Sequence, residues 1–250
     1  MMRLMISGAC GRMGRMITRE AADAGFEVVA GIDAQGCGDT DFPVFEGFSA
    51  CDVPADVLID FSSPRALSPL LAYAQAHRLP SVLGTTGYTA DDMRHIDEAA
   101  VHIAIFQSSN MSVGVYVLKT LVAQAKAMLP GFDIEIVEKH HNKKADAPSG
   151  TALTLYEALK DEDSLPTFGR EGRQTLRQAQ EVGLHAVRGG TLAGEHEVGF
   201  YGNNECLLLT HSAQSRQIFA LGALQAARFI VKQPAGRCGM AQMLGQSVQG

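Results

Sequence analysis

The sequence lacks several features that define whole classes of protein. No apolar stretch approaches the ~20 residues that span a bilayer, and the apolar run near the N-terminus is too short for a signal peptide. We therefore expect a cytoplasmic protein with no membrane partner. Basic runs of five or more residues are also absent, and the formal net charge is −6. Nucleic-acid binding is not expected from such a charge balance.

Cysteine is scarce and irregularly spaced. The five cysteines are Cys10, Cys37, Cys51, Cys206 and Cys238. No two of them form a C-x-x-C pair, which argues against a zinc ribbon or a redox dithiol. Free thiols in a reducing cytoplasm are the simplest prediction.

The composition is that of a globular protein. Of the 250 residues, 46% are hydrophobic and 19% are charged. This content excludes a disordered chain, and the length suits one large domain or two modest ones.

Short apolar runs alternate with helical patterns through the first 110 residues or so. Because the runs are rich in Val and Ile and do not alternate with polar residues, they are typical of strands buried on both faces of a parallel sheet. Helices are expected between them, for example at Arg12–Ala24 and Ala66–His77. The pattern predicts a doubly wound α/β fold. The predicted strands are Leu4–Ser7, Val28–Ile32, Val57–Phe61, Ser81–Leu83 and Ile103–Phe106.

The pattern changes after residue 112. A long helix is predicted over 113–128, and residues 133–139 alternate as in a strand with one buried face. Further strands are predicted around 184–188, 195–201 and 205–211, followed by a helix over 217–232. The polar stretch 160–180 is expected to be a loop or insertion. Clustered strands of this kind indicate a second, mixed domain.

A glycine-rich turn joins the first strand to the first helix. Gly8, Gly11 and Gly14 are spaced G-x-x-G-x-x-G, and Arg12 and Met13 lie within the turn. Glycine lets the backbone approach a pyrophosphate at a helix N-terminus, although ordinary strand–helix turns use it too. The sequence therefore favours a dinucleotide site here without requiring one.

An acidic residue ends the second predicted strand. Asp33 lies about 20 residues beyond the glycine turn, where a carboxylate accepts hydrogen bonds from the adenine-ribose hydroxyls. A carboxylate at that position repels a 2′-phosphate, and the next residues, Ala34 and Gln35, supply no arginine. We expect NADH to serve at least as well as NADPH, which is less favoured.

Two further segments follow the carboxyl ends of predicted strands, where ligands bind in open α/β sheets. The first holds Gly84, Thr85 and Thr86, and the second holds Ser108, Asn110 and Met111. Small and hydroxyl-bearing residues suit close contact with a nicotinamide. Plain turns are the alternative interpretation of either segment.

The segment from Glu138 to Ala152 is the densest in chemically active side chains. Ser149 is a natural N-cap, which leaves the amides of Gly150 and Thr151 to bind an anion such as a carboxylate. Positive charge comes from neighbouring lysines and histidines.

Three interpretations of this segment stay open on spacing alone. It can be a solvated charged loop, a metal site or a proton-donor site for a dianionic substrate. The metal site is the weakest, because adjacent histidines on an extended backbone point to opposite faces and no third ligand has a natural spacing, so no metal is expected. We expect His77 and His102 to be surface or packing residues. His185, His196 and His211 are weaker candidates for ligand contact than His140 and His141.

The sequence resembles the 4-hydroxy-tetrahydrodipicolinate reductase (dihydrodipicolinate reductase) family. The ordered series that carries the resemblance spans nearly the whole chain. It comprises Gly8–Gly14, Ile59–Ser62, Gly84–Gly87, Asn110–Gly114, the segment Glu138-x-His140-His141-x-x-Lys144-x-Asp146 through Ala152, Arg188–Gly190, Gly194–His196, and Thr210-His211 with Arg216.

The resemblance implies a Rossmann-type doubly wound parallel sheet with an inserted α+β domain for substrate binding and oligomerisation. The expected dinucleotide-binding domain comprises residues 1–111 and 217–250, and the inserted domain residues 112–216. A homotetramer built through the sheet of the inserted domain is also implied.

The resemblance assigns roles residue by residue. His140 becomes the catalytic acid/base and Lys144 a proton donor. Gly84 and Thr86 are placed near nicotinamide and substrate. Substrate contacts are expected from His141, Ser149, Gly150, Thr151 and Thr86. Two departures from the family pattern stand out. The arginine that follows the acid in dual-specificity members is missing after Asp33, and Lys143 replaces a third histidine found in some members.

The expected function is reduction of 4-hydroxy-tetrahydrodipicolinate or dihydrodipicolinate by NAD(P)H in diaminopimelate and lysine biosynthesis. One alternative is another Rossmann dehydrogenase of a small acid. A semialdehyde enzyme of that kind needs a cysteine nucleophile in the crevice. Cys10 lies in the glycine turn, and Cys51, Cys206 and Cys238 have no histidine patterned beside them. The other alternative is an NADH-binding redox sensor without turnover, which would not need the segment His140–Thr151.

Overall fold

The computed structural model describes residues 1–173 and 176–245 and divides the chain into two compact units. The first unit joins Met1–Met111 to the chain from Gln217 onward, and the second is Ser112–Arg216. Residues 246–250, which the sequence analysis includes in the dinucleotide-binding domain, lie outside the described residues.

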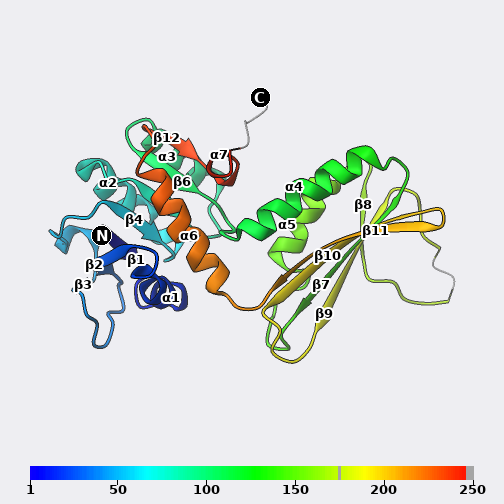
Figure 1. Cartoon of the computed structure of the whole chain (residues 1–250), viewed down its shortest axis with the longest axis horizontal. Coiled ribbons are helices and arrows are strands. Elements are labelled where there is room, and N and C mark those ends of the chain that lie inside the picture. Colours follow the sequence, from blue (N-terminus) through cyan, green and yellow to red (C-terminus); the bar gives the residue numbers. More distant parts are fainter. Residues whose placement is uncertain (174–175, 246–250) are drawn as a thin grey trace. The chain divides into compact units, whose positions relative to one another are not determined.

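The first unit is built on a seven-stranded sheet in the order β12-β6-β5-β4-β1-β2-β3 (Figure 1). Every pairing in it is parallel. The strands are β1 (Met2–Ser7), β2 (Phe26–Ile32), β3 (Val44–Phe45), β4 (Val57–Asp60), β5 (Ser81–Leu83), β6 (Ala104–Gln107) and β12 (Gly236–Cys238).

Helices cover both faces of this sheet, as the apolar strands require. The helices are α1 (Arg12–Ala21), α2 (Leu67–His77), α3 (Ala90–Ala100), α6 (Gln217–Ile230) and α7 (Met240–Met243), with short 3₁₀ turns at Phe48–Ala50 and Pro64–Ala66. On one face α2 and α3 share a core with Met5, Leu58 and Leu83. On the other, α6 packs along β4, β5 and β6, and α1 packs on α6.

The strand order places a topological switch point beside β1. The chain moves outward from β1 to β2 and β3, then returns to pair β4 on the other side of β1. A crevice opens at such a point, at the carboxyl ends of the strands. The Rossmann-type fold predicted from the sequence is confirmed, and the turn Gly8–Gly14 stands at this edge.

The prediction of free thiols is wrong for Cys10 and Cys37, which form a disulfide with their Cα atoms 5.3 Å apart. The loop between β2 and β3 returns across the glycine turn and brings the two sulfurs together. A pairing that depends on the path of a loop leaves no local sequence signal. Cys51, Cys206 and Cys238 are free, as predicted.

The second unit contains a five-stranded mixed sheet in the order β11-β10-β7-β9-β8. Strands β10 and β11 are antiparallel, as are β10 and β7, whereas β9 runs parallel to both β7 and β8. The strands are β7 (Asp133–His140), β8 (Leu165–Phe168), β9 (Glu181–Arg188), β10 (Gly194–Gly202) and β11 (Glu205–Ala213).

Two helices cover one face of this sheet (Figure 1): α4 (Val113–Met128) and α5 (Gly150–Leu159). Leu118 and Val122 of α4 and Leu155 of α5 form a core with Ile136 of β7 and Val198 of β10. Alternate residues of β7 are buried, which confirms the predicted one-sided strand.

The polar stretch 160–180 is not simply a loop, as the sequence analysis expects, because it contains the edge strand β8. Arg170 and Arg177 of this stretch form ion pairs with Glu135 of β7. Charge pairing therefore stabilises a segment whose composition offers little apolar burial. Residues 174–175 of the stretch lie outside the described residues. Within the described chain, no helix is both long and apolar enough to cross a membrane.

Candidate active site

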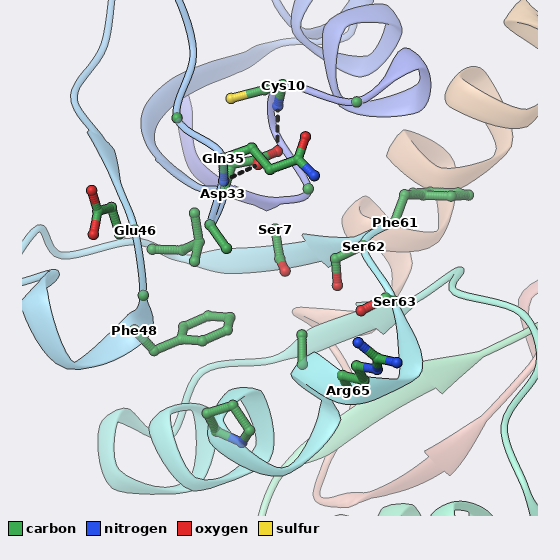
Figure 2. A pocket seen from close by; sticks show the side chains of 18 of the residues that line it. Ser7, Cys10, Asp33, Gln35, Glu46, Phe48, Phe61, Ser62, Ser63 and Arg65 are labelled. Carbon is green, nitrogen blue, oxygen red and sulfur yellow. Dashed lines mark hydrogen bonds between the residues drawn. The ribbon is translucent and has the colours of Figure 1, made fainter.

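A cavity of about 1140 Å³ opens at the carboxyl ends of β1 and β2 in the first unit (Figure 2). Its wall combines the glycine turn, the turn after β2, the segment after β3 and the start of α2. The lining residues used below are Gly8, Cys10, Gly11, Arg15, Asp33, Gln35, Gly36, Phe61, Ser62 and Arg65.

Glycine is required at two points in the glycine turn, which forms part of this wall. Gly8 has φ +77°, and a Cβ there would lie 2.6 Å from the carbonyl oxygen of Phe61. A Cβ on Gly14 would lie 2.2 Å from the carbonyl oxygen of Gly8, so the turn packs directly on the first turn of α1. The backbone approach that a pyrophosphate needs is therefore built in, and α1 begins at Arg12.

Asp33 follows β2 and faces the glycine turn (Figure 2). Its Oδ2 accepts a hydrogen bond of 3.0 Å from the Cys10 N–H, and its Oδ1 accepts one of 3.1 Å from the Gln35 N–H. Two amides thus fix the carboxylate without neutralising it. A fixed carboxylate in this position can accept hydrogen bonds from ribose hydroxyls and repels a 2′-phosphate.

Two arginines that the sequence analysis overlooked also line this cavity. Arg15 donates through Nε to the Cys10 carbonyl oxygen, over 2.9 Å. Arg65 lies in the 3₁₀ turn Pro64–Ala66, just before α2, away from Asp33 (Figure 2). These cations suit the phosphate groups of a dinucleotide.

A second cavity, of about 450 Å³, shares Phe61 and Ser62 with the first. Its lining brings together the two segments that follow β5 and β6. The lining residues are Arg12, Met13, Phe61, Ser62, Gly84, Thr85, Thr86, Ser109, Asn110, Met111 and Phe219. A Cβ on Gly84 would lie 2.4 Å from the Phe61 ring, so only glycine allows this approach.

Asp60 is buried behind the second cavity and holds two of its lining residues, Ser62 and Thr85, by hydrogen bonds. Its side chain is 1% exposed and accepts hydrogen bonds from Ser62 Oγ (2.5 Å), Thr85 Oγ1 (2.6 Å) and the Tyr88 hydroxyl (3.3 Å). Burial, followed by the Asp60 charge, raises the pKa of Tyr88, so this hydroxyl stays protonated and donates. Asp60 lies within the segment Ile59–Ser62 that carries the family resemblance, and an acid in an apolar strand is a visible sequence signal for such a role.

The structure gathers most of the sequence-predicted cofactor residues around these two cavities. Gly8, Gly11 and Asp33 line the first, whereas Arg12, Met13, Gly84, Thr85, Thr86, Asn110 and Met111 line the second. Among the described residues, Gly14 and Ser108 line neither. Ser108 instead shapes its segment, because its Oγ donates to the Asn110 carbonyl oxygen over 2.7 Å.

The second unit contains a buried carboxylate–histidine pair at the end of β7. Glu138 and His140 face the same side of the strand, with Oε2 and Nδ1 2.5 Å apart. Glu138 is fully buried, and His140 is 8% exposed. With the carboxylate ionised, Nδ1–H of His140 donates to it and Nε2 is the nitrogen that exchanges a proton with a ligand. A Cβ on Gly194 would lie 2.8 Å from that Nε2, so glycine keeps space open there.

Two other groups hold Glu138 in place. Arg188, from the end of β9, donates to both carboxylate oxygens over 2.7 and 2.6 Å. The Ser149 N–H donates to Oε1 over 3.0 Å. Burial by itself raises the pKa of Glu138, but the hydrogen bonds from Arg188, His140 and Ser149 outweigh it and keep the pKa below its ordinary value. Glu138 is therefore an anion at neutral pH.

Ser149 caps α5, as the sequence predicts. Its Oγ accepts the Ala152 N–H over 3.1 Å and lies 2.8 Å from Nε2 of His196. Gly150 opens the helix and is exposed, and Thr151 follows it in the first turn. This helix N-terminus is a site of positive potential beside His140, suited to a carboxylate.

His196 of β10 is a member of this cluster that the sequence analysis ranked low. It is 5% exposed, and its ring centroid lies 5.1 Å from that of His140 in an edge-on arrangement. Burial, followed by the His140 charge, lowers the pKa of His196 to about 4. His196 is consequently neutral at physiological pH and positions the Ser149 hydroxyl.

Further cations surround the cluster. Lys144 pairs with Asp146 over 2.9 Å, and Arg216 lies 3.4 Å from Nε2 of His141. Burial and then the charge of Arg216 lower the pKa of His141. Positive charge therefore concentrates around the start of α5, which favours a dianionic ligand.

Sequence reasoning missed the partners of the predicted catalytic histidine. Glu138 carried a signal, since a charged residue on the apolar side of a one-faced strand must be paired. Arg188 and His196 lie in segments that carry the family resemblance, but their place beside His140 could not be predicted, because they reach the site only through the pairing of β9 and β10 with β7. Within the described chain, no cluster of three His, Cys, Asp or Glu side chains is arranged to hold a metal ion.

Comparison with known proteins places both units in one family. Residues 2–111 match the family model "Dihydrodipicolinate reductase, N-terminus", and residues 114–244 match "Dihydrodipicolinate reductase, C-terminus". The 4-hydroxy-tetrahydrodipicolinate reductase of Clostridium tetani is 44% identical over 98% of this chain and 97% of its own length. That of Caldanaerobacter subterraneus is 45% identical over 94% and 95%.

Solved structures share the fold. The dipicolinate-bound dihydrodipicolinate reductase of Paenisporosarcina sp. TG-14 matches with a TM-score of 0.81 at 23% identity, covering 97% of this chain and 98% of that one. An amine dehydrogenase of Mycobacterium smegmatis matches with a TM-score of 0.63 at 10% identity, covering 95% and 94%.

Proposed function

Because the chain belongs to the dihydrodipicolinate reductase family, we propose that it reduces 4-hydroxy-tetrahydrodipicolinate to tetrahydrodipicolinate with NADH, using His140 and Lys144. It is an oxidoreductase with a pyridine-nucleotide-binding Rossmann domain. The reaction serves diaminopimelate and lysine biosynthesis in the cytoplasm.

The first unit fits a reduced dinucleotide. The backbone at Gly8 and Gly11 binds the pyrophosphate, and Asp33 accepts hydrogen bonds from the adenine ribose. Thr85 and Thr86 border the space for the nicotinamide. When bound, this cofactor supplies hydride to the substrate ring. Because Asp33 lies where a 2′-phosphate would bind and is followed by Ala34 and Gln35 rather than by an arginine, we expect NADH to be used at least as well as NADPH.

The second unit fits a ring bearing two carboxylates. One carboxylate lies at the N-terminus of α5, where Ser149, Gly150 and Thr151 hold it by hydrogen bonds. Lys144 and His141 add positive charge on the same side. Holding the ring at two points fixes the carbon that accepts hydride and the neighbouring carbon that accepts a proton.

His140 supplies the proton that completes the reduction. Charge that develops on the conjugated ring is quenched at the carbon next to the one that receives hydride. Glu138 orients the imidazole by accepting a hydrogen bond from Nδ1–H, which leaves Nε2 as the nitrogen that passes a proton to the ligand. Lys144, which lies beside the cluster, assists loss of the 4-hydroxyl group as water by donating a proton to it, while the neighbouring ring carbon gives up its proton to solvent as the ring double bond forms.

The 2.5 Å contact between Glu138 and His140 is the observation that carries this proposal, because it turns a histidine into an oriented acid. The test is oxidation of NADH, followed by absorbance, with freshly prepared substrate. We expect turnover by the wild type and a kcat lower by about 10²–10⁴-fold for His140→Gln, with NADH binding unchanged. As a control, His185→Gln, on the open face of the sheet, keeps its activity.

Other results would favour the alternatives. NADH binding without substrate-dependent turnover would identify a sensor, and turnover of a different small acid would identify another dehydrogenase. A semialdehyde mechanism needs a cysteine nucleophile in the crevice, and Cys10, which lines the first cavity, is bonded to Cys37.

We also propose a homotetramer assembled through the open face of the sheet in the second unit. The two helices cover the opposite face, and the open face exposes Val187, Tyr201 and Leu208 at 46%, 40% and 47%. Exposed apolar side chains on a sheet face are typical of a subunit interface. Light scattering on the purified protein measures the assembly directly.

A further inference from the structure

The disulfide between Cys10 and Cys37 joins two segments of the nucleotide cavity that are otherwise separate in the chain. Cys10 belongs to the glycine turn, and Cys37 to the loop between β2 and β3. We propose that these cysteines are a reversible redox site whose oxidation strengthens dinucleotide binding. The inference rests on the proposed placement of the dinucleotide in the cavity beside Asp33.

The disulfide holds the turn that follows Asp33 against the glycine turn. The Asp33 carbonyl oxygen accepts the Gly36 N–H over 3.1 Å, and Cys37 is the next residue. At the other end, the Cys10 N–H donates to Asp33 Oδ2. The sulfur bridge therefore closes a ring in which Asp33 is fixed from both sides.

The bridge leaves the cavity open to a ligand. Cys10 lines the large cavity, whereas Cys37 lines a neighbouring one together with Ala9 and Arg15. Figure 2 shows the Cys10 nitrogen directed at Asp33 and its sulfur directed to the side. Oxidation thus fixes the wall that meets the ribose without filling its space.

Reduction would release an exposed segment. Gly36 and the residues 38–41 are exposed, and Cys37 itself is only half-buried. A segment with little buried surface gains little from packing, so a covalent link is an effective way to order it. Once the link is cut, a bound dinucleotide must order Ala34–Gly36 again, and affinity falls by that cost.

The chemistry balances with a dithiol as reductant. A thiolate of the dithiol attacks one sulfur of the pair and breaks the S–S bond, and its second thiol then completes its own disulfide. Two electrons and two protons pass to Cys10 and Cys37, which become thiols. A disulfide oxidant reverses the step. Cys10 and Cys37 are both partly exposed, so such a partner can reach the pair.

The test compares NADH affinity in the two redox states by calorimetry. One sample is treated with oxidised glutathione and then freed of it, and another is reduced with dithiothreitol. We expect NADH to bind roughly three- to tenfold more tightly to the oxidised protein. Cys37→Ser should bind like the reduced protein in both samples. Cys206→Ser, whose cysteine is free and in the other unit, should respond like the wild type.

Thiol titration of the unfolded protein and peptide mass spectrometry verify the linkage. Oxidised protein should show thiols only at Cys51, Cys206 and Cys238. Equal NADH affinity in the two states, tighter binding to the reduced state, or failure of the pair to oxidise would each overturn the proposal. Absence of NADH binding in both states would instead overturn the cofactor assignment, and the redox inference with it.

Discussion

Glu138 and Arg188 form a two-pronged ion pair across neighbouring strands of the second unit. Both guanidinium Nη atoms donate to the carboxylate, over 2.7 and 2.6 Å, and the carboxylate in turn holds His140. Arg188 lies opposite His140 in the parallel pairing of β7 with β9. The pair thus links the orientation of the candidate acid to the register of the sheet.

Glu138→Gln is the most direct test of this relationship. The neutral amide is a weaker acceptor for the Nδ1–H of His140 and orients the imidazole less firmly, so kcat should fall by about 10²–10⁴-fold. The free energy of unfolding should also fall by about 3 kcal/mol, because Arg188 loses its buried partner.

Glu135→Gln is a matched control for that variant. Glu135 lies on the same strand and is also ion-paired, but it faces the opposite side of the sheet. The Glu135→Gln variant should have a lower free energy of unfolding than the wild type and an unchanged kcat. Similar losses of kcat in both variants would show that Glu138 acts only through the fold.

Lys144 and Lys143 are neighbours with different expected roles. Lys144 is partly buried beside the histidine cluster, whereas Lys143 is exposed. Lys144→Ala should lower kcat, and it should also weaken binding of dipicolinate, a planar dicarboxylate analogue, because a fixed cation is lost. Lys143→Ala should change both quantities less than threefold or so, as for an exposed charge. Equal effects of the two substitutions would contradict the assignment of Lys144.

His196 makes stability depend on pH. Its pKa in the folded protein is about 4, below the ordinary 6.5, so the unfolded chain binds the proton more tightly. Its stabilising contribution is fully present above pH 6.5 and is lost as pH falls toward 4. Between pH 7 and pH 5 that loss amounts to about 2 kcal/mol.

His196→Gln should therefore reduce the fall in unfolding free energy between pH 7 and pH 5, as measured by urea titration. His102→Gln, at an exposed position, should leave the fall unchanged. The value of kcat/KM for the substrate should also fall in His196→Gln, since Ser149 loses its histidine partner. An unaltered pH dependence in that variant would show that His196 is not protonated on unfolding in this range.

Asp33 should set the preference between the two cofactors. Asp33→Asn keeps an oxygen for the Cys10 N–H but removes the charge that repels a 2′-phosphate. The ratio of kcat/KM for NADPH to that for NADH should rise about tenfold, as measured with both cofactors. Asp39→Asn, at an exposed position on the following loop, should leave the ratio unchanged. A tenfold preference of the wild type for NADPH would overturn the expectation from Asp33.

The open face of the sheet should carry the assembly. Leu208→Lys places a charge on that face and should lower the mass measured by light scattering. Val117→Lys, on helix α4, changes a residue of similar exposure, 44% against 47%, and should leave the mass unchanged. A wild-type protein that is monomeric at micromolar concentration would refute the proposed tetramer.

Much of the first unit was predictable from local patterns. Short apolar runs such as Val57–Phe61 must be covered on both faces, and helices between them impose parallel strands. The same reasoning missed the short strands β3 and β12 and the edge strand β8. Their pairing is decided by neighbouring strands and, for β8, by ion pairs to Glu135, so none of the three has a strong pattern of its own.

The sequence by itself determined the fold class, the glycine turn at Gly8–Gly14, the acid at Asp33 and the capped start of α5 at Ser149, because each depends on residues close together in the chain. Only the tertiary structure decided that Arg188 and His196 join Glu138 and His140, and that Cys10 bonds to Cys37. Those contacts join residues far apart in sequence, and their formation depends on strand register and loop paths that local propensities do not specify.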